Sequence, residues 1–337
     1  MTEAIILVGG QGTRLRPLTN HTPKPMLPVA GVPLVEHQIR KLAAAGIQRI
    51  VLATSYRADT FRTLGDGGAF SLQLTYAVES EPLGTGGAIR HAADELSGVD
   101  DVVVLNGDVL SGHDLVEQLA VHRSSGAVAT LHLVRVADPR AFGCVPTDAS
   151  GRVQAFLEKD PDPVTDQINA GCYVLSADAL SQIPHGRVVS VERETFPGLL
   201  AAGAHLQGYL GEADWLDLGT PADYVRGCRD VVTGDLPSPA IPNPPGEALL
   251  LAGAQVDPVA VVEGGSTIGA GAVVAAGAVV RGSVLRDGAH IGPDAVILDS
   301  AIGQRARVGA GARLERVTVG DDETVADGSR PEAGSRI

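Results

Sequence analysis

Five short runs of mostly aliphatic residues in the first half of the chain have the length and composition of buried β-strands. They occupy residues 4–8, 49–53, 72–78, 101–106 and 128–134. Apolar character that is nearly continuous, rather than alternating, is typical of parallel strands that are covered on both faces. We therefore expect a sheet in this part of the chain that is buried on both sides.

Apolar residues also recur at helical spacing between these runs. One helix is expected over residues 35–43 and ends before Gly46, and a second has Leu115 and Leu119 on one face and Ser111 and Asp114 at its start. Strands that alternate with helices predict an α/β fold with a Rossmann-like, mostly parallel sheet. Ligands of such sheets bind outside the carboxyl ends of the strands. Functional residues are therefore expected in the loops that follow strands.

Residues 246–337 carry an internal repeat with a period of six. The repeating positions are Val256, Val262, Ile268, Val274 and Val280, then Ile291 and Ile297, then Ile302, Val308 and Leu314. This period fits one short strand and one turn on each side of a three-sided coil, with aliphatic side chains stacked inside. A Gly/Ala-rich linker would not keep its β-branched residues in phase. The pattern resembles the hexapeptide-repeat left-handed parallel β-helix, and its phase shifts predict an imperfect coil of a few turns.

The composition changes at the stretch LPSPAIPNPP, residues 236–245. All eleven aromatic residues lie before position 225, and sixteen of the 42 glycines lie in residues 246–337. Five prolines in such a stretch predict a stiff, extended linker. We therefore predict a first domain over residues 1–235, a linker over 236–245 and a β-helix domain over 246–337.

The chain has 26 basic and 40 acidic residues among 337, which gives a net charge of −14. No nucleic-acid or membrane partner is expected from this balance, and an anionic ligand would need a local group of positive charges. The three cysteines (Cys144, Cys172 and Cys228) fit neither a disulfide framework nor a zinc site. We recognise no export signal and no apolar run long enough for a membrane span, so the expected location is the cytoplasm.

A glycine-rich loop, GGQGTRLRPLTNHTPKPMLP, directly follows the first predicted strand and spans residues 9–28. Its glycines allow backbone N–H groups to approach a phosphate closely, and Arg14 adds a permanently charged donor. The loop lacks the Gly-Lys-Ser/Thr ending of a Walker A motif, and Leu15 stands where a dinucleotide fingerprint has its third glycine. The glycines alone therefore fit a plain strand-to-helix turn equally well.

Lys24 lies between two prolines in this loop, which restrict its backbone. The chain has three lysines, at positions 24, 41 and 159, against 23 arginines. A lysine in a rigid loop is suited to placing a compact positive charge. Lys41, on the first predicted helix, is expected to be an ordinary solvated residue.

The pattern GxGTRLxPLTxxxPKPMLP resembles that of the sugar-1-phosphate nucleotidyltransferases, the nucleotide-sugar pyrophosphorylases. The phrases FGCVPTD, FLEK, DQINAGCYV and VSVERETFP resemble the actinobacterial-type mannose-1-phosphate guanylyltransferases that have a hexapeptide-repeat tail. The resemblance implies attack of a sugar 1-phosphate on the α-phosphorus of a nucleoside triphosphate, most simply mannose 1-phosphate and GTP giving GDP-mannose and pyrophosphate. Because the nucleophile is already an anion, no general base or covalent intermediate is needed.

The resemblance assigns the chemistry to a few charged residues. Arg14 would hold the triphosphate and the leaving pyrophosphate, and Lys24 would neutralise charge near the α-phosphate. Asp108, which ends VVVLNGD, and Asp217, in WLDLGTPADY, would bind Mg²⁺. Taken alone, either aspartate also fits a turn former or a helix cap.

The resemblance places nucleotide binding at Leu7, Gly9, Gly10, Gly12, Thr13, Glu79, Pro82, Gly84 and Thr85. Glu79 favours guanine, because one carboxylate can accept hydrogen bonds from the adjacent N1–H and N2–H groups, whereas thymine or uracil would suit an amide. The neighbouring Glu81 could be the contact instead, and an exposed acidic loop without a ligand is the remaining alternative.

Sugar-phosphate binding is assigned by the same resemblance to Gly143, Glu158, Lys159, Asn169 and Gly171. Lys159 would hold the phosphate, and it is counted among the catalytic residues together with Arg14, Lys24, Asp108 and Asp217. Glu158 and Asn169 would bond ring hydroxyls. A surface ion pair is the alternative for adjacent Glu and Lys.

Other functions are compatible with the sequence. Within the same reaction class, the acceptor could be a cyclitol 1-phosphate, or the enzyme could be a glucose-1-phosphate nucleotidyltransferase. Hexapeptide-repeat coils also occur in acyltransferases, although His290 is the one histidine of this tail. A non-catalytic nucleotide-sugar sensor is a further class. An open-ended coil with aliphatic surface favours a homo-oligomer formed through the C-terminal domain.

Overall fold

The computed structural model of this chain describes residues 2–55, 57–158 and 162–337. It contains two compact units. The first combines Met1–Gly10 with Gln38–Trp215, and the second combines Gln11–His37 with Leu216–Ile337. The glycine-rich loop is thus shared, because its first residues belong to the first unit and the remainder to the second. The domain boundary at residues 236–245 stays a prediction.

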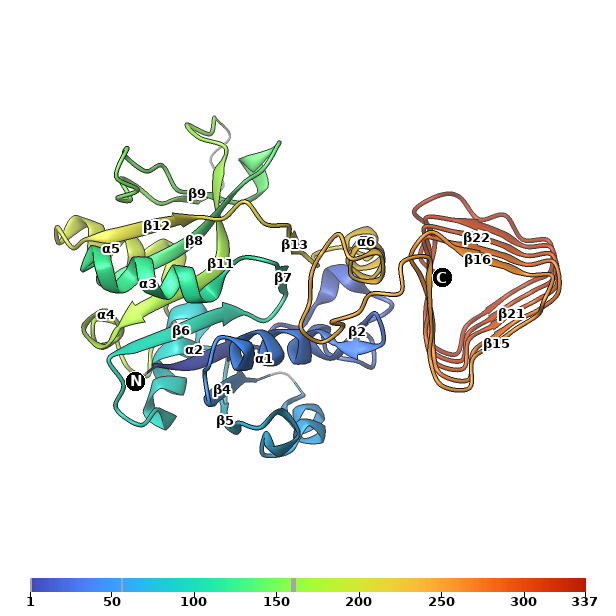
Figure 1. Ribbon diagram of the computed structural model, residues 1–337, viewed down its shortest axis with the longest axis horizontal. Coiled ribbons are helices and arrows are strands. Elements are labelled where there is room, and N and C mark those ends of the chain that lie inside the picture. Colours follow the sequence, from blue (N-terminus) through green and yellow to red (C-terminus); the bar gives the residue numbers. More distant parts are fainter. Residues whose placement is uncertain (1, 56, 159–161) are drawn as a thin grey trace. The chain divides into compact units, whose positions relative to one another are not determined.

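The first unit is built on a sheet with nine strands in the described residues, in the order β10-β9-β11-β6-β1-β4-β5, with β8 beside β11 and β12 beside β8 (Figure 1). The strands are β1 (Thr2–Leu7), β4 (Arg49–Thr54), β5 (Gln73–Val78), β6 (Asp101–Asn106), β8 (Ala129–Arg135), β9 (Gly143–Cys144), β10 (Leu157–Glu158), β11 (Gln167–Ser176) and β12 (Leu206–Leu210). Each predicted run forms a strand. β1 lies parallel to β4 and β6, and β4 lies parallel to β5. The sheet is nevertheless mixed, since β11 runs antiparallel to β6 and β8.

The helices are α1 (Leu34–Ala44), α2 (Gly84–Ala92), α3 (Leu115–Ser125), α4 (Ala177–Ser181), α5 (Phe196–Ala201) and α6 (Pro221–Thr233). The two helices predicted from apolar spacing are confirmed as α1 and α3, although Ser111, expected at the start of the second helix, ends a short strand instead. Asp114 caps α3, because its carboxylate accepts hydrogen bonds from the backbone N–H groups of Val116 and Glu117. Within the described part of the chain, we find no helix with both the length and the apolar character that a membrane crossing requires.

Backbone hydrogen bonds hold the carboxyl ends of the parallel strands next to one another. The N–H of Val8 donates to the carbonyl of Ala53 at 2.9 Å, and the N–H of Gly107 donates to the carbonyl of Leu7, also at 2.9 Å. A Cβ at Gly107 would lie 2.2 Å from that carbonyl oxygen, so glycine is required for this approach. The loops that follow β1, β4 and β6 therefore start from one edge of the sheet.

Lys41 is not the solvated residue that we expected. Its Nζ donates to the carbonyl of Ser111 at 2.6 Å and lies 3.0 Å from Nδ1 of His113, which stacks on His132 with ring centroids 3.8 Å apart. Burial lowers the pKa of Lys41 to about 8 and that of His132 to about 3. The expectation fails because β7 (Val109–Ser111) runs next to this side of α1.

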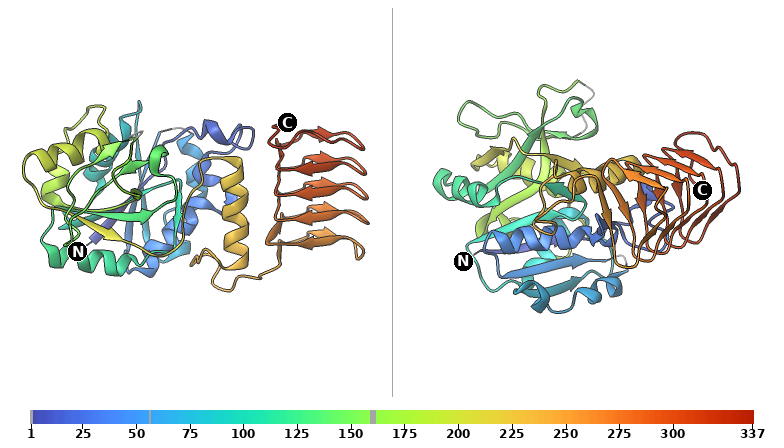
Figure 2. Two further views of the ribbon diagram at one scale, coloured as in Figure 1. Left: turned by 90° about the horizontal axis from the view of Figure 1, so that it is seen from above. Right: turned by 45° about the vertical axis from the view of Figure 1, so that its right-hand side comes forward.

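The region 246–337 is described in full, and its strands form three parallel sheets of a β-helix, as predicted. The strands are β14 (Ala248–Leu250), β15 (Gln255–Val256), β16 (Val261–Glu263), β17 (Ser266–Ile268), β18 (Val273–Val274), β19 (Val279–Arg281), β20 (Val284–Leu285), β21 (His290–Ile291), β22 (Val296–Leu298), β23 (Ala301–Ile302), β24 (Arg307–Val308), β25 (Arg313–Glu315), β26 (Thr318–Val319) and β27 (Thr324–Val325). In Figure 1 the coils overlie one another in a three-sided outline, and Figure 2 shows them as stacked layers.

The phase shifts of the repeat are a regular feature of the coil rather than an imperfection. Leu250 is paired with Ile268 after 18 residues, whereas Ile268 is paired with Leu285 and Leu285 with Ile302 after 17 residues. From the second coil onwards, one corner of each coil is therefore one residue shorter than the six-residue period. Leu285 takes the inward position after that corner, which is why a strict period of six misses it.

Ser266, Ser283 and Ser300 form a buried ladder at this short corner. The N–H of Ser283 donates to Oγ of Ser266 at 3.1 Å, and the N–H of Ser300 donates to Oγ of Ser283 at 3.1 Å. The same contact recurs from the N–H of Val317 to Oγ of Ser300 at 3.0 Å. These hydroxyls satisfy backbone donors that are buried in the corner.

The proline-rich segment turns back instead of running extended as expected. The N–H of Ile241 donates to the carbonyl of Ser238 at 3.0 Å, and the N–H of Gly246 returns to the carbonyl of Val232, in α6, at 2.9 Å. Oγ of Ser238 lies 2.6 Å from Nδ1 of His37. Hydrogen bonds to its neighbours therefore override the extended preference of the prolines.

The serine ladder predicts that Ser283→Ala lowers the free energy of unfolding by about 1–3 kcal/mol, because the N–H of Ser300 would be buried without an acceptor. Chemical denaturation followed by circular dichroism measures this change. Ser335→Ala, near the end of the same coil, is the control and is expected to change stability by less than about 0.5 kcal/mol. Equal losses in the two variants would contradict the proposed role of the ladder.

Candidate functional site

The loop that carries the predicted phosphate-binding residues folds back on itself within the second unit. Gly12 has a φ of 62°, and a Cβ at this position would lie 2.9 Å from Cβ of Lys24. The hydroxyl of Thr19 donates to the carbonyl of Gly12 at 2.8 Å. Glycine at position 12 therefore allows the loop to bring Lys24 against its own beginning.

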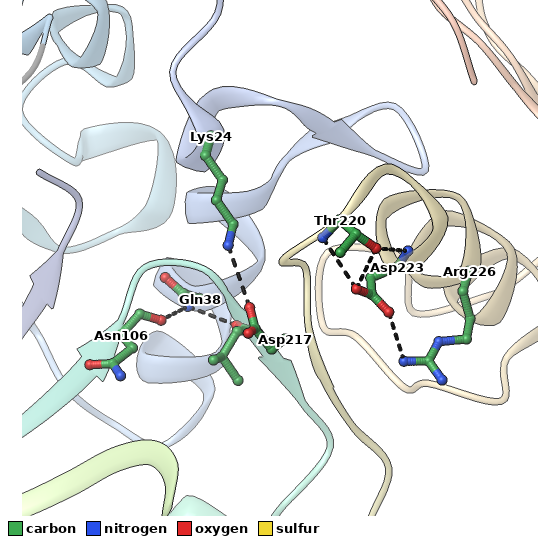
Figure 3. Close-up of polar contacts among 8 residues, drawn as sticks. Lys24, Gln38, Asn106, Asp217, Thr220, Asp223 and Arg226 are labelled. Atoms are coloured by element: carbon green, nitrogen blue, oxygen red, sulfur yellow. Dashed lines mark hydrogen bonds and ion pairs between the residues drawn. The ribbon is translucent and has the colours of Figure 1, made fainter. Parts of the chain in front are cut away.

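Lys24 is buried and faces an acidic partner. Its side chain is 9% exposed, and its Nζ lies 3.4 Å from Oδ1 of Asp217 (Figure 3). Asp217 ends β13 (Trp215–Asp217) and is 25% exposed. Pro23 precedes and Pro25 follows the lysine at the start of a short 3₁₀ turn. The short turn and the two prolines agree with the prediction that Lys24 lies in a rigid part of the loop.

Arg14 approaches the same carboxylate from the other end of the loop. A Cβ at Gly219 would lie 3.2 Å from Oδ2 of Asp217 and 3.4 Å from Nη2 of Arg14. The guanidinium group and the carboxylate thus both lie beside Gly219, a position without a side chain. The structure brings together three of the predicted catalytic residues, Arg14, Lys24 and Asp217, within the second unit.

The turn after Asp217 is fixed by the start of α6. The hydroxyl of Thr220 and the carboxylate of Asp223 form a capping box, in which each side chain bonds the backbone of the other residue (Figure 3). Arg226 lies 3.3 Å from the same Asp223 carboxylate, on the exposed side of α6. A capped helix start therefore holds the residues that follow the acidic partner of Lys24.

Asp108 belongs to the first unit, on the turn between β6 and β7. The side-chain amide of Gln38 donates to the carbonyls of Asn106 and Val109 at 2.8 Å each, so one buried amide spans this turn (Figure 3). Oδ1 of Asn106 is a buried acceptor for which the described residues offer no donor. Gln38 thus fixes the backbone on both sides of Asp108, a role that we did not predict.

Asn169, predicted to bind the sugar, takes part in a partly buried polar network of the first unit. Its Nδ2 donates to the hydroxyl of Tyr173 at 2.7 Å, and that hydroxyl donates to Oε1 of Glu192 at 3.4 Å. The hydroxyl of Thr85 donates to Oε2 of Glu192 at 2.7 Å. Burial raises the pKa of Tyr173 well above its ordinary value. We did not predict a role for Glu192, although the phrase VSVERETFP contains it.

The remaining predicted sugar residues lie on neighbouring strands. Gly143, in β9, is paired with the backbone of Glu158, in β10. Gly171 has a φ of 76° within β11, and a Cβ there would meet the side chain of Asn106 at 2.9 Å. Lys159 and the side chain of Glu158 lie outside what the structure describes. The predicted phosphate contact of Lys159 therefore stays a prediction.

Glu79 follows β5 and has a buried acceptor. Its N–H donates to the carbonyl of Thr54 at 2.8 Å, and Glu79 is 9% exposed. Its Oε1 is buried and has no hydrogen-bond donor among the described residues. Burial raises the pKa of Glu79, against opposing contributions from the N–H of Leu83 and the charge of His91. A ligand that donates hydrogen bonds would satisfy this carboxylate.

The other predicted nucleotide residues are divided between the units. Leu7 ends β1, Gly9 accepts a hydrogen bond from the hydroxyl of Ser55 at 3.0 Å, and a Cβ at Gly10 would meet nothing within 4 Å. Pro82 precedes α2, which begins at Gly84 and Thr85. Gly12 and Thr13 belong to the second unit.

No cluster of three or more histidine, cysteine, aspartate or glutamate side chains that could hold a metal ion occurs in the described residues. The two predicted metal ligands, Asp108 and Asp217, belong to different units. Magnesium commonly needs just one or two carboxylates, because substrate phosphates supply further oxygens. The partly exposed carboxylate of Asp217 has the right chemistry for one such ligand.

Comparison with known proteins identifies the family. The Nucleotidyl transferase family profile matches residues 3–233, and the profile of the GMPPB C-terminal domain matches residues 245–330. A mannose-1-phosphate guanylyltransferase of Mycobacterium tuberculosis is 53% identical over 287 residues, which are 85% of this chain and 80% of that protein. Mannose-1-phosphate guanylyltransferase 1 of Arabidopsis thaliana is 41% identical over 233 residues, 67% of this chain and 64% of that protein.

Solved structures give the same result for the fold. The crystal structure of HddC from Yersinia pseudotuberculosis complexed with GMP-PN has a TM-score of 0.58 and 30% identity, and covers 68% of this chain and 98% of that chain. A putative glucose-1-phosphate thymidylyltransferase from Bacillus anthracis in complex with a sucrose has a TM-score of 0.62 and 26% identity, and covers 68% of this chain and 94% of that chain. With the glycine-rich loop and the profile match over residues 3–233, these similarities show that the chain belongs to the nucleotidyl transferase family.

Proposed function

We propose that this chain is a mannose-1-phosphate guanylyltransferase, which joins GTP and mannose 1-phosphate to give GDP-mannose and pyrophosphate. The choice of substrates is supported by the 53% identity to the Mycobacterium tuberculosis enzyme over 85% of this chain. The observation that carries the reaction type is the ion pair of Lys24 with Asp217, together with the position of Arg14 beside the neighbouring Gly219. Two cations in the same part of the second unit suit a reaction between two anions.

Positioning and charge compensation are sufficient for this chemistry. A phosphate oxygen of the sugar 1-phosphate attacks the α-phosphorus, and the bond from that phosphorus to the leaving pyrophosphate breaks, so no proton has to be removed from the nucleophile. Lys24 would offset the negative charge that builds up around the α-phosphorus, and Arg14 would bind the departing pyrophosphate. Burial strengthens the effect of a charge, since less water screens it.

Asp217 and Asp108 are the residues that we propose to hold Mg²⁺, with phosphate oxygens as further ligands. The bound ion would neutralise phosphate charge during transfer. The backbone around Asp108 is fixed by Gln38, and the position of Asp217 is fixed by Lys24 and by the capped start of α6. Each carboxylate is therefore carried by a backbone that is held in place within its own unit.

Guanine is the base that we propose for the site next to Glu79. The N1–H and N2–H of guanine are adjacent donors, which can pair with the two oxygens of one carboxylate. The buried Oε1 of Glu79, for which the described residues provide no donor, supports this assignment. Leu7, Gly9, Gly10, Gly12, Thr13, Pro82, Gly84 and Thr85 complete the proposed nucleotide site. The hydroxyl of Thr85 already bonds Glu192, so its own contribution would come from its backbone.

For the sugar, we propose Gly143, Glu158, Asn169 and Gly171 as contacts of the ring and Lys159 as the contact of its phosphate. The network of Asn169, Tyr173 and Glu192 supports a fixed orientation for Asn169. A side-chain amide that is held at one end presents its other atoms to a ligand in a defined direction.

We also propose that the protein works in the cytoplasm and that the C-terminal coil joins copies of the chain. The buried thiols Cys172 and Cys228, whose pKa values burial raises to about 12, suit a reducing compartment. The first coil exposes Leu250, Val259 and Val261, the kind of apolar surface that a second copy could cover.

The proposed function predicts that the purified protein releases pyrophosphate from GTP and mannose 1-phosphate, and that EDTA abolishes the release because the metal is removed. The measurement crosses five nucleoside triphosphates with the 1-phosphates of mannose, glucose and N-acetylglucosamine. Release with GTP that is slow with every one of these sugar 1-phosphates would contradict mannose and favour an acceptor such as a cyclitol 1-phosphate. No release with any pair would contradict the proposed enzyme.

Lys24→Met is expected to lower kcat by about 10²- to 10³-fold, because a positioned charge next to the reacting phosphate is lost. Steady-state kinetics with GTP and mannose 1-phosphate measure the effect. Arg226→Met is the control, since it removes an exposed cation of α6 that pairs with Asp223. A similar loss in the control would show that net charge, rather than the position of Lys24, matters.

The raised pKa of Glu79 predicts a pH dependence of GTP binding. As the pH falls through this raised pKa, the carboxylate gains a proton and one acceptor becomes a donor, so KM for GTP is expected to rise. Above that pKa, KM should stay level. Glu79→Gln should remove both the pH-dependent rise and the preference for GTP over ATP. If Glu81→Gln does so instead, Glu81 is the contact.

A further inference from the structure

The β-helix contains an ion pair that lies outside its aliphatic core and is nevertheless buried. Nη1 of Arg286, which follows β20, lies 2.7 Å from Oδ1 of Asp321, which follows β26, and the two side chains are 6% and 4% exposed. Arg281 and Glu263 form another ion pair of the β-helix, and their side chains are 61% and 38% exposed. A buried ion pair loses its hydration, so the surroundings of Arg286 and Asp321 must supply other polar contacts.

The loop of residues 11–37 supplies one of these contacts. Nη2 of Arg286 donates to the hydroxyl of Thr22 at 3.2 Å, and Oδ1 of Asp321 also accepts a hydrogen bond from the N–H of Gln304 at 2.8 Å. Thr22 directly precedes Pro23 and Lys24. The buried pair therefore touches the chain two residues before the ammonium group of the site.

Two more contacts hold the same loop on either side of Thr22. Nη1 of Arg336, at the end of the coil, donates to the carbonyl of Arg16 at 3.1 Å. The hydroxyl of Tyr224, in α6, donates to the carbonyl of Pro28 at 2.7 Å. The C-terminal part of the chain thus bonds the loop before, next to and after the segment that carries Lys24.

We propose that Arg286 is a positioning residue for the transfer reaction: Asp321 orients its guanidinium group, which fixes Thr22 and thereby the proline-bounded segment of Lys24. This inference rests on the proposed function. The β-helix then has a part in catalysis, because it sets the position of a charge that acts on the reacting phosphate. Displacement of such a group by about 1 Å is enough to slow a reaction strongly.

Arginine is suited to this role in a way that lysine is not. Its planar guanidinium group presents separate N–H groups, so that one can bond Asp321 while another bonds Thr22. A lysine at position 286 would keep the charge next to Asp321 but would lose this fixed fork. Arg286→Lys therefore keeps a positive charge next to Asp321 but loses the contact that positions the loop through Thr22.

The test compares Thr22→Val and Arg286→Lys with wild type and with Arg281→Met, which breaks the exposed pair with Glu263. Thr22→Val removes the hydroxyl and leaves the ion pair of Arg286 and Asp321 intact. We expect both test variants to lower kcat by about tenfold while KM for mannose 1-phosphate stays within about twofold, because the loop acts on the transition state. Arg281→Met should keep the wild-type kcat. A wild-type kcat in Thr22→Val and Arg286→Lys would overturn the proposal.

Hydrogen exchange of the backbone amides gives a second readout that needs no turnover. The N–H groups of Met26 and Leu27 bond the carbonyls of Pro23 and Lys24, so they report on the turn that holds the lysine. Their exchange should be faster in Thr22→Val and Arg286→Lys than in wild type and Arg281→Met. Unchanged exchange in the test variants would overturn the proposal. If wild type itself does not use GTP and mannose 1-phosphate, the proposed function fails, and exchange alone decides the role of Arg286.

Discussion

A buried ammonium group needs an anion beside it, and the pairing of Lys24 with Asp217 is the interaction on which the rest of this site depends. The two residues are 193 positions apart, so two distant segments of the chain must come together within the second unit before they meet. Loss of hydration makes a buried charge costly by several kcal/mol unless such a partner is present. Gly12 and Gly219, and the capped start of α6, are the local features that allow this approach.

The strands and the local motifs could be predicted from the sequence because each depends on neighbouring residues. The aliphatic runs formed strands, and Asp114 formed a helix cap, since burial and capping act within a few positions. The β-helix was predicted for the same reason. Leu285 was missed, because the corner before it is one residue shorter, which shifts the phase of the six-residue repeat and changes the register between coils from 18 residues to 17.

Contacts between distant segments could not be predicted in this way. Lys41 looked solvated because the pattern of α1 does not reveal that β7 runs beside it. Thr22 and Arg286 are 264 positions apart, and neither residue type at those places suggests the other. Glu192 stands in a phrase that indicated the family, but its bond to Thr85 depends on how the segments pack. Sequence reasoning therefore identified the charged residues proposed to act on the substrates, but it missed the residues that hold neighbouring segments in position.

Buried acceptors without donors provide an independent argument for where ligands bind in the first unit. Among the described residues, Thr54 ends β4, Glu79 follows β5 and Asn106 ends β6, and each has a buried side-chain oxygen without a hydrogen-bond partner. Each such group destabilises the folded state by about 1–3 kcal/mol. These three oxygens lie at the carboxyl ends of parallel strands, so this part of the destabilisation falls where parallel sheets bind ligands. A ligand rich in N–H and O–H groups would regain this free energy by donating hydrogen bonds to these oxygens. The base and the sugar of the proposed substrates carry such groups.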